Sequence, residues 1–398
     1  MDRLSTEIVR EILGHVQSKP DLARLRLVQN SFAKLVNEFL FQVIHIGPAF
    51  ESLCVLVEIS RIPELARCVK RVVLHVDDFR DLTWIPFNKR LEEKNIQDEA
   101  RKAEVFKTFQ ALDRELFEFQ TLTDYTVMLS VAFGHLSRLE AVKLAHRYPE
   151  DETELFRRER RDLERLLSLE EFHGEDGEKD DLRAFTALID AAYFTEKKIS
   201  SFRITGKLDL SVFENTELIR RAAVVFRNCR VLELDFSPQS PFHDKDHIRK
   251  GPLFDMLSSA VHLKSLTLCG GIRQEPDVPF SKYLGDRFVW KSLNRIDILG
   301  LDMHAYEFLG FLERHKKTLR KVAIGASKLF TGRWPDIMRY MKGHLRLTSL
   351  ELGAWLEDID EEGTDYGYGE RDMEMMERFV MDGGELLPED ARRYEIIS

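Results

Sequence analysis

A short pattern of apolar positions, here called the frame, recurs along the chain: apolar, two residues, apolar, one residue, apolar. Each frame predicts a strand with one buried face, because alternate side chains of a strand point to opposite faces. Six of the eight steps between successive frames are 26 to 34 residues long. The frames begin at Phe41, Val69, Leu139, Ile199, Cys229, Leu263, Leu293, Leu319 and Leu347.

The segments between later frames carry apolar residues at helical spacing, as in LFDMLSSAVH and HAYEFLGFLERHKK. A unit of one strand and one helix cannot bury its apolar face alone, so neighbouring units must stack. The period is typical of leucine-rich repeats, although the asparagine expected after the strand is absent: Gly271 and Leu301 stand there. The chain therefore resembles a degenerate leucine-rich-repeat protein. The alternative is an ordinary doubly wound α/β sheet.

The first 46 residues carry a different pattern. Thr6 and Asp21 are expected to cap two short helices, and a third is expected to begin at Asn30 or Ser31. A three-helix segment of this length has a very small core and usually buries its surplus apolar surface against another molecule.

The residues LSTEIVREILGHVQSKPDLARLRLVQNSFAKLVNEFLF resemble the F-box motif in order and spacing. The chain departs from it at Ser5, where the family usually has proline. The resemblance implies binding to a Skp-type adaptor, which links an F-box protein to a cullin and a RING subunit. The alternative is a plain three-helix cap on the repeats. The adaptor-binding residues expected from the resemblance are Leu4, Ile8, Ile12, Leu13, Leu22, Leu25, Leu27, Val28, Phe32 and Leu40.

The combination resembles fungal F-box proteins with irregular leucine-rich repeats. In such repeats, the residues between the apolar strand positions face the concave side. This implies a surface that is basic in the early repeats and acidic in the middle ones, and such a surface can orient a charged partner. The expected partner-binding residues are Arg71, Lys143, Arg203, Glu233, Asp235 and Asp297.

The expected fold is therefore α/β: an F-box over residues 1–46, then an irregular leucine-rich-repeat solenoid over 47–380. Charged, helix-forming insertions are expected near 88–120 and 150–195. The acidic residues 357–372 predict a mobile loop, and a helix near Met373–Phe379 is expected to cap the last repeat. Residues 381–398 are assigned to a C-terminal tail.

Composition narrows the class of protein. The chain has 398 residues, of which 43% are hydrophobic and 32% charged, so it can form a core. The net charge of −10 disfavours nucleic acid. No apolar stretch is long enough to span a membrane, and the N-terminus lacks the features of a signal peptide. The four cysteines form no CxxC pair and indicate reduced thiols in the cytoplasm or nucleus.

Motifs of the common enzyme classes are absent, including GxSxG, GxxxxGK[ST], HExxH and GxGxxG after a strand. His243 and His247 stand in a polar loop and lack further metal ligands nearby in the sequence. We therefore expect no enzyme activity, cofactor or metal. The leading hypothesis is a substrate receptor of a Skp–cullin–F-box ubiquitin ligase. The alternatives are an F-box scaffold that does not direct ubiquitylation, and an α/β enzyme with an unrecognised site.

Overall fold

In the computed structural model of the protein, the chain divides into two compact units, Met1–Ile199 and Ser200–Ser398. Both units combine helices with parallel strands, so the mixed α/β class predicted from the sequence is confirmed. The residues described are 5–16, 18–28, 30–47, 50–75, 92, 98–103, 105–107, 123–145, 180–205, 208, 210–236, 251–272, 284–359, 365–386 and 394–395.

The first unit begins with three short helices: α1 (Thr6–Gly14), α2 (Lys19–Arg26) and α3 (Asn30–Leu40). Serines, and not the expected Thr6 and Asp21, cap the first two helices. The Ser5 hydroxyl accepts the Ile8 N–H at 3.4 Å, and the Ser18 hydroxyl accepts the Asp21 N–H at 3.3 Å. An N-cap side chain accepts the backbone N–H of the second or third helical residue. Ser5 and Ser18 each lie three residues before the N–H that they accept, which is the N-cap position.

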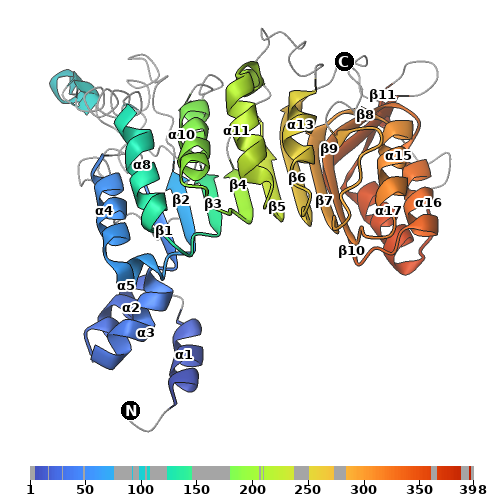
Figure 1. Ribbon diagram of the computed structural model, residues 1–398. Coiled ribbons are helices and arrows are strands. Elements are labelled where there is room, and N and C mark those ends of the chain that lie inside the picture. Colours follow the sequence, from blue (N-terminus) through green and yellow to red (C-terminus); the bar gives the residue numbers. More distant parts are fainter. Residues whose placement is uncertain are drawn as a thin grey trace. The chain divides into compact units, whose positions relative to one another are not determined.

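Three parallel strands follow in the same unit: β1 (Val43–Ile46), β2 (Arg71–His75) and β3 (Ala141–Ala145). Strand β2 pairs with both others. The connecting helices include α4 (Phe50–Arg61), α5 (Pro63–Ala66), α8 (Thr123–His135) and α10 (Asp180–Phe194). Helix α8 packs against both α4 and α10, so the helices form a layer beside the strands (Figure 1).

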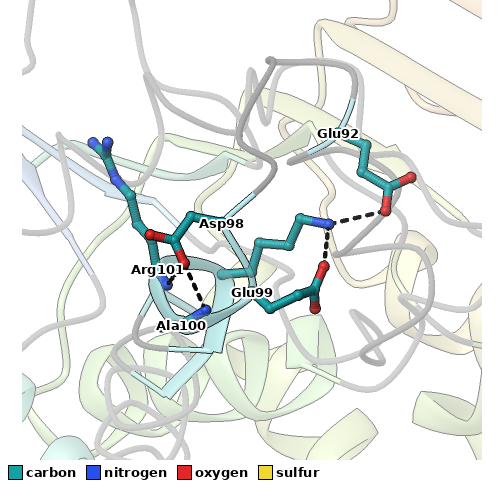
Figure 2. A network of polar contacts seen from close by, with 6 residues as sticks. Glu92, Asp98, Glu99, Ala100 and Arg101 are labelled. Carbon is teal, nitrogen blue, oxygen red and sulfur yellow. Dashed lines mark hydrogen bonds and ion pairs between the residues drawn. The ribbon is translucent and has the colours of Figure 1, made fainter.

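The predicted insertion near 88–120 is described in part, at residues 92, 98–103 and 105–107. Here the Asp98 carboxylate accepts the backbone N–H groups of Ala100 and Arg101 at the start of a helical segment (Figure 2). The Lys102 ammonium lies 3.0 Å from a Glu92 carboxylate oxygen and 2.8 Å from one of Glu99. These bonds raise the Lys102 pKa and hold its charge. The predicted insertion at 150–195 is described only from residue 180, within α10.

In the described part of the second unit, the main parallel strands follow one another in sequence order: β4 (Ser201–Thr205), β5 (Val231–Asp235), β6 (Ser265–Ile272), β7 (Arg295–Leu301), β9 (Lys321–Thr331) and β10 (Ser349–Ile359). Between them lie η3 (Leu210–Glu214), α11 (Thr216–Phe226), α13 (Pro252–Ser258), α15 (Ala305–His315) and α16 (Trp334–His344). The short strand β8 (Met303–His304) pairs with β9.

The strand register pairs equivalent positions of the frame. Leu232 is opposite Leu266, which is opposite Ile296, and Ile296 is opposite Val322. All of these side chains are at most 1% exposed. The frame therefore predicted both the strands and the face that they bury.

The last strands of the sheet are antiparallel. Strand β11 (Asp365–Tyr368) is antiparallel to β10, and β12 (Tyr394–Glu395) is antiparallel to β11. The loop predicted over 357–372 is therefore wrong for 357–359 and 365–372, which belong to β10, β11 and α17 (Glu370–Asp382), with Gly369 as the N-cap of α17. Residues 360–364 lie outside the described residues.

A buried carboxylate explains the order at this end. Asp358 is fully buried and accepts the Tyr368 hydroxyl at 2.6 Å and the Trp334 N–H at 3.3 Å. These bonds compensate for burial of the charge, whereas the sequence suggested self-repulsion alone. The expected capping helix is α17, which packs on α16 and β10 with Met373 and Met376 buried. Met375 and Phe379, also expected on its buried side, are half-buried.

Candidate functional site

The expected adaptor-binding residues form two groups. One group belongs to the core of the three-helix segment, in which Val9, Leu13, Leu22 and Val36 are buried. Leu25, Phe32 and Leu40 are partly buried against that core. We conclude that Leu13 and Leu22 hold the segment together, and that a partner could reach them only if the segment opened.

The other group is exposed and is here called the apolar surface: Ile8, Ile12, Leu27 and Val28. The exposed fractions are 47% and 51% for Ile8 and Ile12, and 85% and 68% for Leu27 and Val28. Ile8 and Ile12 lie one turn apart on α1, so they share one face of that helix. Leu4 lies outside the described residues.

The three helices are also tied by charge. The Arg10 guanidinium donates to both carboxylate oxygens of Glu38 on α3, at 3.1 and 3.0 Å. This contact raises the Arg10 pKa, first through the hydrogen bond and then through the opposite charge. Both side chains are nearly half exposed, so we expect the pair to orient α1 more than to stabilise it.

The expected partner-binding residues lie on the strand positions between the buried frame positions. In the first unit, Arg71 is exposed on β2 and Lys143 is half-buried on β3. The strand register places Arg71 opposite Ala141 and Lys143 opposite Val73. Arg71 and Lys143 therefore lie on the same face of the two strands, and their positions along the strands differ by two residues.

In the second unit, the corresponding positions of β4 to β10 define a surface that we call the sheet face. The expected acidic middle of this surface is largely neutralised. The Arg203 guanidinium lies 3.6 Å from Glu233 on the next strand. Asp297 accepts Arg295 Nε at 2.8 Å and the Thr267 hydroxyl at 3.0 Å. The sequence could not show the contacts of Glu233 with Arg203 and of Asp297 with Thr267, because they depend on pairing between strands.

Asp235 contributes to the electrostatics of a thiol on the same surface. It is opposite Cys269 in the strand register. Burial, followed by the charges of Asp235, Glu233 and Asp297, raises the pKa of Cys269 to about 12. A thiol with so high a pKa is protonated at neutral pH and is a poor nucleophile. The sheet face therefore carries polar groups suited to binding, and its cysteine is not activated for catalysis.

Sequence reasoning missed the apolar part of the sheet face. Leu299 is 38% exposed and Trp355 is 56% exposed. Between them, Gly325 is opposite Gly353 in the strand register. A Cβ at Gly325 would lie 2.5 Å from the Gly353 carbonyl oxygen, so a side chain there would force the strands to shift. The sequence contained a signal for this close approach of the strands, because Gly325 and Gly353 each directly follow the last residue of a frame.

Other candidate chemistry can be assessed over the described residues. The four cysteines are free; Cys68 and Cys229 are buried, and Cys54 and Cys269 are half-buried. In the described part of the chain, no group of three or more His, Cys, Asp or Glu side chains is arranged to hold a metal ion. His243 and His247 lie outside it. None of the described helices is long and apolar enough to cross a membrane.

Comparison with known proteins adds no assignment. No protein-family model matches the chain, and no curated protein matches it significantly.

Proposed function

We propose that the protein is a non-enzymatic substrate receptor of a Skp–cullin–F-box ubiquitin ligase. Residues 5–40 would bind a Skp-type adaptor, and the sheet face would bind a target protein. The observation that carries the proposal is the exposure of Ile8, Ile12, Leu27 and Val28 on a three-helix segment that already has its own core.

Helix α1 supports this proposal most directly. Val9 and Leu13 form its inward stripe, whereas Ile8 and Ile12 form a second stripe that faces solvent. A helix with apolar residues on more than one face is usually covered on both sides. Leu27 and Val28 follow α2 and are still more exposed, which is unusual for two consecutive large apolar residues. Their positions agree with the F-box resemblance of the sequence.

The sheet face supports the second half of the proposal. Its strands carry polar and charged side chains, with Leu299 and Trp355 exposed among them. Exposed aromatic residues among paired charges are typical of protein-binding surfaces. Such a receptor would bring its target close to a conjugating enzyme and would need no catalytic residues of its own.

Affinity capture of the full chain, scored separately for the Skp-type adaptor and for the cullin, tests this proposal. We expect wild type to capture both, and the double substitution Ile8→Ser and Ile12→Ser to lose both. The matched control is Val127→Ser with Val131→Ser, which removes two exposed apolar residues one turn apart on α8. Equal capture by wild type and the α1 variant would refute adaptor binding by this surface.

The same capture separates the proposal from its alternatives. Adaptor without cullin would favour an interaction scaffold that does not direct ubiquitylation. Capture of neither subunit by correctly folded wild type would remove the F-box interpretation and return attention to an enzyme on an α/β fold.

A further inference from the structure

A second charged surface lies in the second unit, along the side of the sheet at which the parallel strands begin. Five turns lead into β5, β6, β7, β9 and β10, at residues 227–231, 261–265, 291–295, 316–321 and 345–349. These turns contain ten Lys or Arg residues and no Asp or Glu, in a chain whose net charge is −10. Seven of the ten side chains are exposed and are here called the basic edge: Arg227, Arg230, Lys264, Lys291, Lys317, Lys321 and Arg346.

Backbone hydrogen bonds show that these turns are neighbours in space. The Arg230 carbonyl accepts the N–H groups of Lys264 and Ser265, at 2.8 and 3.0 Å. The Lys264 carbonyl accepts that of Asn294 at 2.9 Å, and the Asn294 carbonyl accepts that of Arg320 at 2.8 Å. Adjacent strands are about 4.8 Å apart, so the turns form a continuous row along the edge.

Within the part of the chain that the structure describes, the cations of this row have no carboxylate partner. None of the seven side chains forms an ion pair with any residue in the described ranges. This differs from the sheet face, where Arg203 and Arg295 each contact a carboxylate. Closely spaced cations repel one another, so an uncompensated row lowers stability unless something anionic covers it.

Helix dipoles explain part of this pattern. Arg227 is the C-cap of α11 and Lys317 follows the C-cap of α15, where positive charge is favourable. That effect ends with the last helical turn. Arg230, Lys264 and Lys321 lie beyond it, at or next to the first residue of a strand. These three need another explanation.

We propose that the basic edge binds an extended acidic polypeptide segment of a partner protein. The row is one turn wide, which fits a single extended chain. Val261 and Val289 are exposed beside it, at 51% and 43%, and offer apolar contacts between the charges. None of the seven cations is flanked in these turns by an exposed Phe, Tyr or Trp on which bases could stack.

Net charge favours a peptide over a larger polyanion. A short acidic peptide senses charges within a Debye length of about 8 Å at physiological salt. Duplex nucleic acid or an anionic membrane would extend further and meet the negative charge of the remaining protein. The proposal does not depend on adaptor binding by α1, because the two surfaces share no residue.

Fluorescence anisotropy with the full chain provides the test. The probe is a labelled peptide of repeating Glu-Val-Glu-Gly units. The edge variant combines Arg230→Gln, Lys264→Gln and Lys321→Gln. The control variant combines Arg339→Gln, Arg371→Gln and Arg378→Gln, which removes the same charge from exposed positions on α16 and α17. Circular dichroism and adaptor capture should be unchanged in both variants.

We expect wild type to bind the peptide, and the edge variant to bind at least about tenfold more weakly with a shallower salt dependence. The control variant should stay within about twofold of wild type. Equal losses in both variants would mean that net charge alone acts, and no binding by wild type would reject the site. If oligothymidine or phosphatidylserine vesicles bind more tightly than the peptide and lose binding in the edge variant, the acidic-peptide assignment is wrong.

Discussion

The three-helix segment and the sheet of the second unit differ in how completely they bury their apolar side chains. In the sheet, frame residues such as Leu266, Ile296 and Ile298 are fully buried. In the three-helix segment, Ile8 and Leu27 stay exposed beside a core of four buried residues. The frame positions of the sheet are thus buried within the protein, whereas the three-helix segment leaves large apolar side chains exposed to solvent.

This difference leads to a thermodynamic expectation. Stabilisation by burial grows with the apolar area removed from water, so the larger core should dominate the stability of the chain. Substitutions in the sheet should then cost more than equivalent ones in the helices, and substitutions in the apolar surface should cost almost nothing. The effects below are ordered from the largest to the smallest.

Trp290→Ala should have the largest effect. Trp290 is fully buried, packs against Phe288 and His315, and donates its indole N–H to the Leu257 carbonyl at 3.4 Å. Its loss should lower the free energy of unfolding by about 3–5 kcal/mol. Chemical denaturation followed by circular dichroism measures this. Trp355→Ala, at an exposed tryptophan of the same unit, is the control, and a similar loss in both variants would contradict the assigned core.

Leu13→Ala should follow, with a local effect. Leu13 is 2% exposed in the small core of the helices, and its truncation should cost about 2–3 kcal/mol. Hydrogen exchange should lose protection in α1 to α3 and keep it in β5 to β9. Loss of protection throughout the second unit would show that the helices and the sheet unfold together. Any loss of adaptor binding in this variant would reflect unfolding, so Leu13 is a poor probe of contact.

The sequence predicted the sheet better than the candidate surfaces, and the reason is physical. A frame such as Leu263, Leu266 and Leu268 carries its burial in its own periodicity, so strand, face and neighbour follow from it. Which apolar residues of three short helices face inward depends on how the helices cross. The motif grouped Leu13 with its neighbour Ile12, but Leu13 is buried and Ile12 is exposed.

Prediction of the charged surfaces would have required knowledge of contacts between residues that are still further apart in the sequence. Arg203 and Glu233 are distant in sequence and pair only through the strand register. The basic edge was likewise invisible in any single turn, since each turn contributes only one to four cations. Asp358 was assigned to a loop because its segment is acidic, and the sequence did not indicate that Tyr368 and Trp334 bond to its carboxylate.

Acidification should have a smaller effect, centred on the second unit. His315 is 1% exposed; its Nε2 accepts the Trp290 N–H at 3.1 Å and its Nδ1 lies 2.9 Å from the Phe311 carbonyl oxygen. Burial, with a further contribution from Arg314, lowers the His315 pKa. The unfolded chain then binds the proton more readily than the folded one. The stabilisation is complete above the unfolded pKa, near 6.5, and decreases as the pH falls towards the lower folded pKa.

Thermal unfolding of wild type and of His315→Asn between pH 7.5 and about 5 measures this dependence. The variant should be less stable at neutral pH and should lose less stability on acidification than wild type does. Parallel pH profiles for the two proteins would exclude His315 as the titrating group.

The smallest effect on stability is expected where the proposed effect on binding is largest. Leu27 is 85% exposed and Val28 is 68% exposed, so replacing both by serine removes few internal contacts. Their backbone N–H groups bond to the Arg24 and Leu25 carbonyls, at 3.0 and 3.1 Å, and serine preserves both bonds. Leu27→Ser with Val28→Ser should therefore change the free energy of unfolding by no more than about 0.5 kcal/mol, as is usual for surface positions.

The same variant should fail to capture the Skp-type adaptor, because two large apolar anchors would be lost from the contact. Urea denaturation and adaptor capture on one preparation measure both quantities. A loss of more than about 2 kcal/mol would place these side chains in a core. Unchanged capture would show that the adaptor does not use this part of the apolar surface.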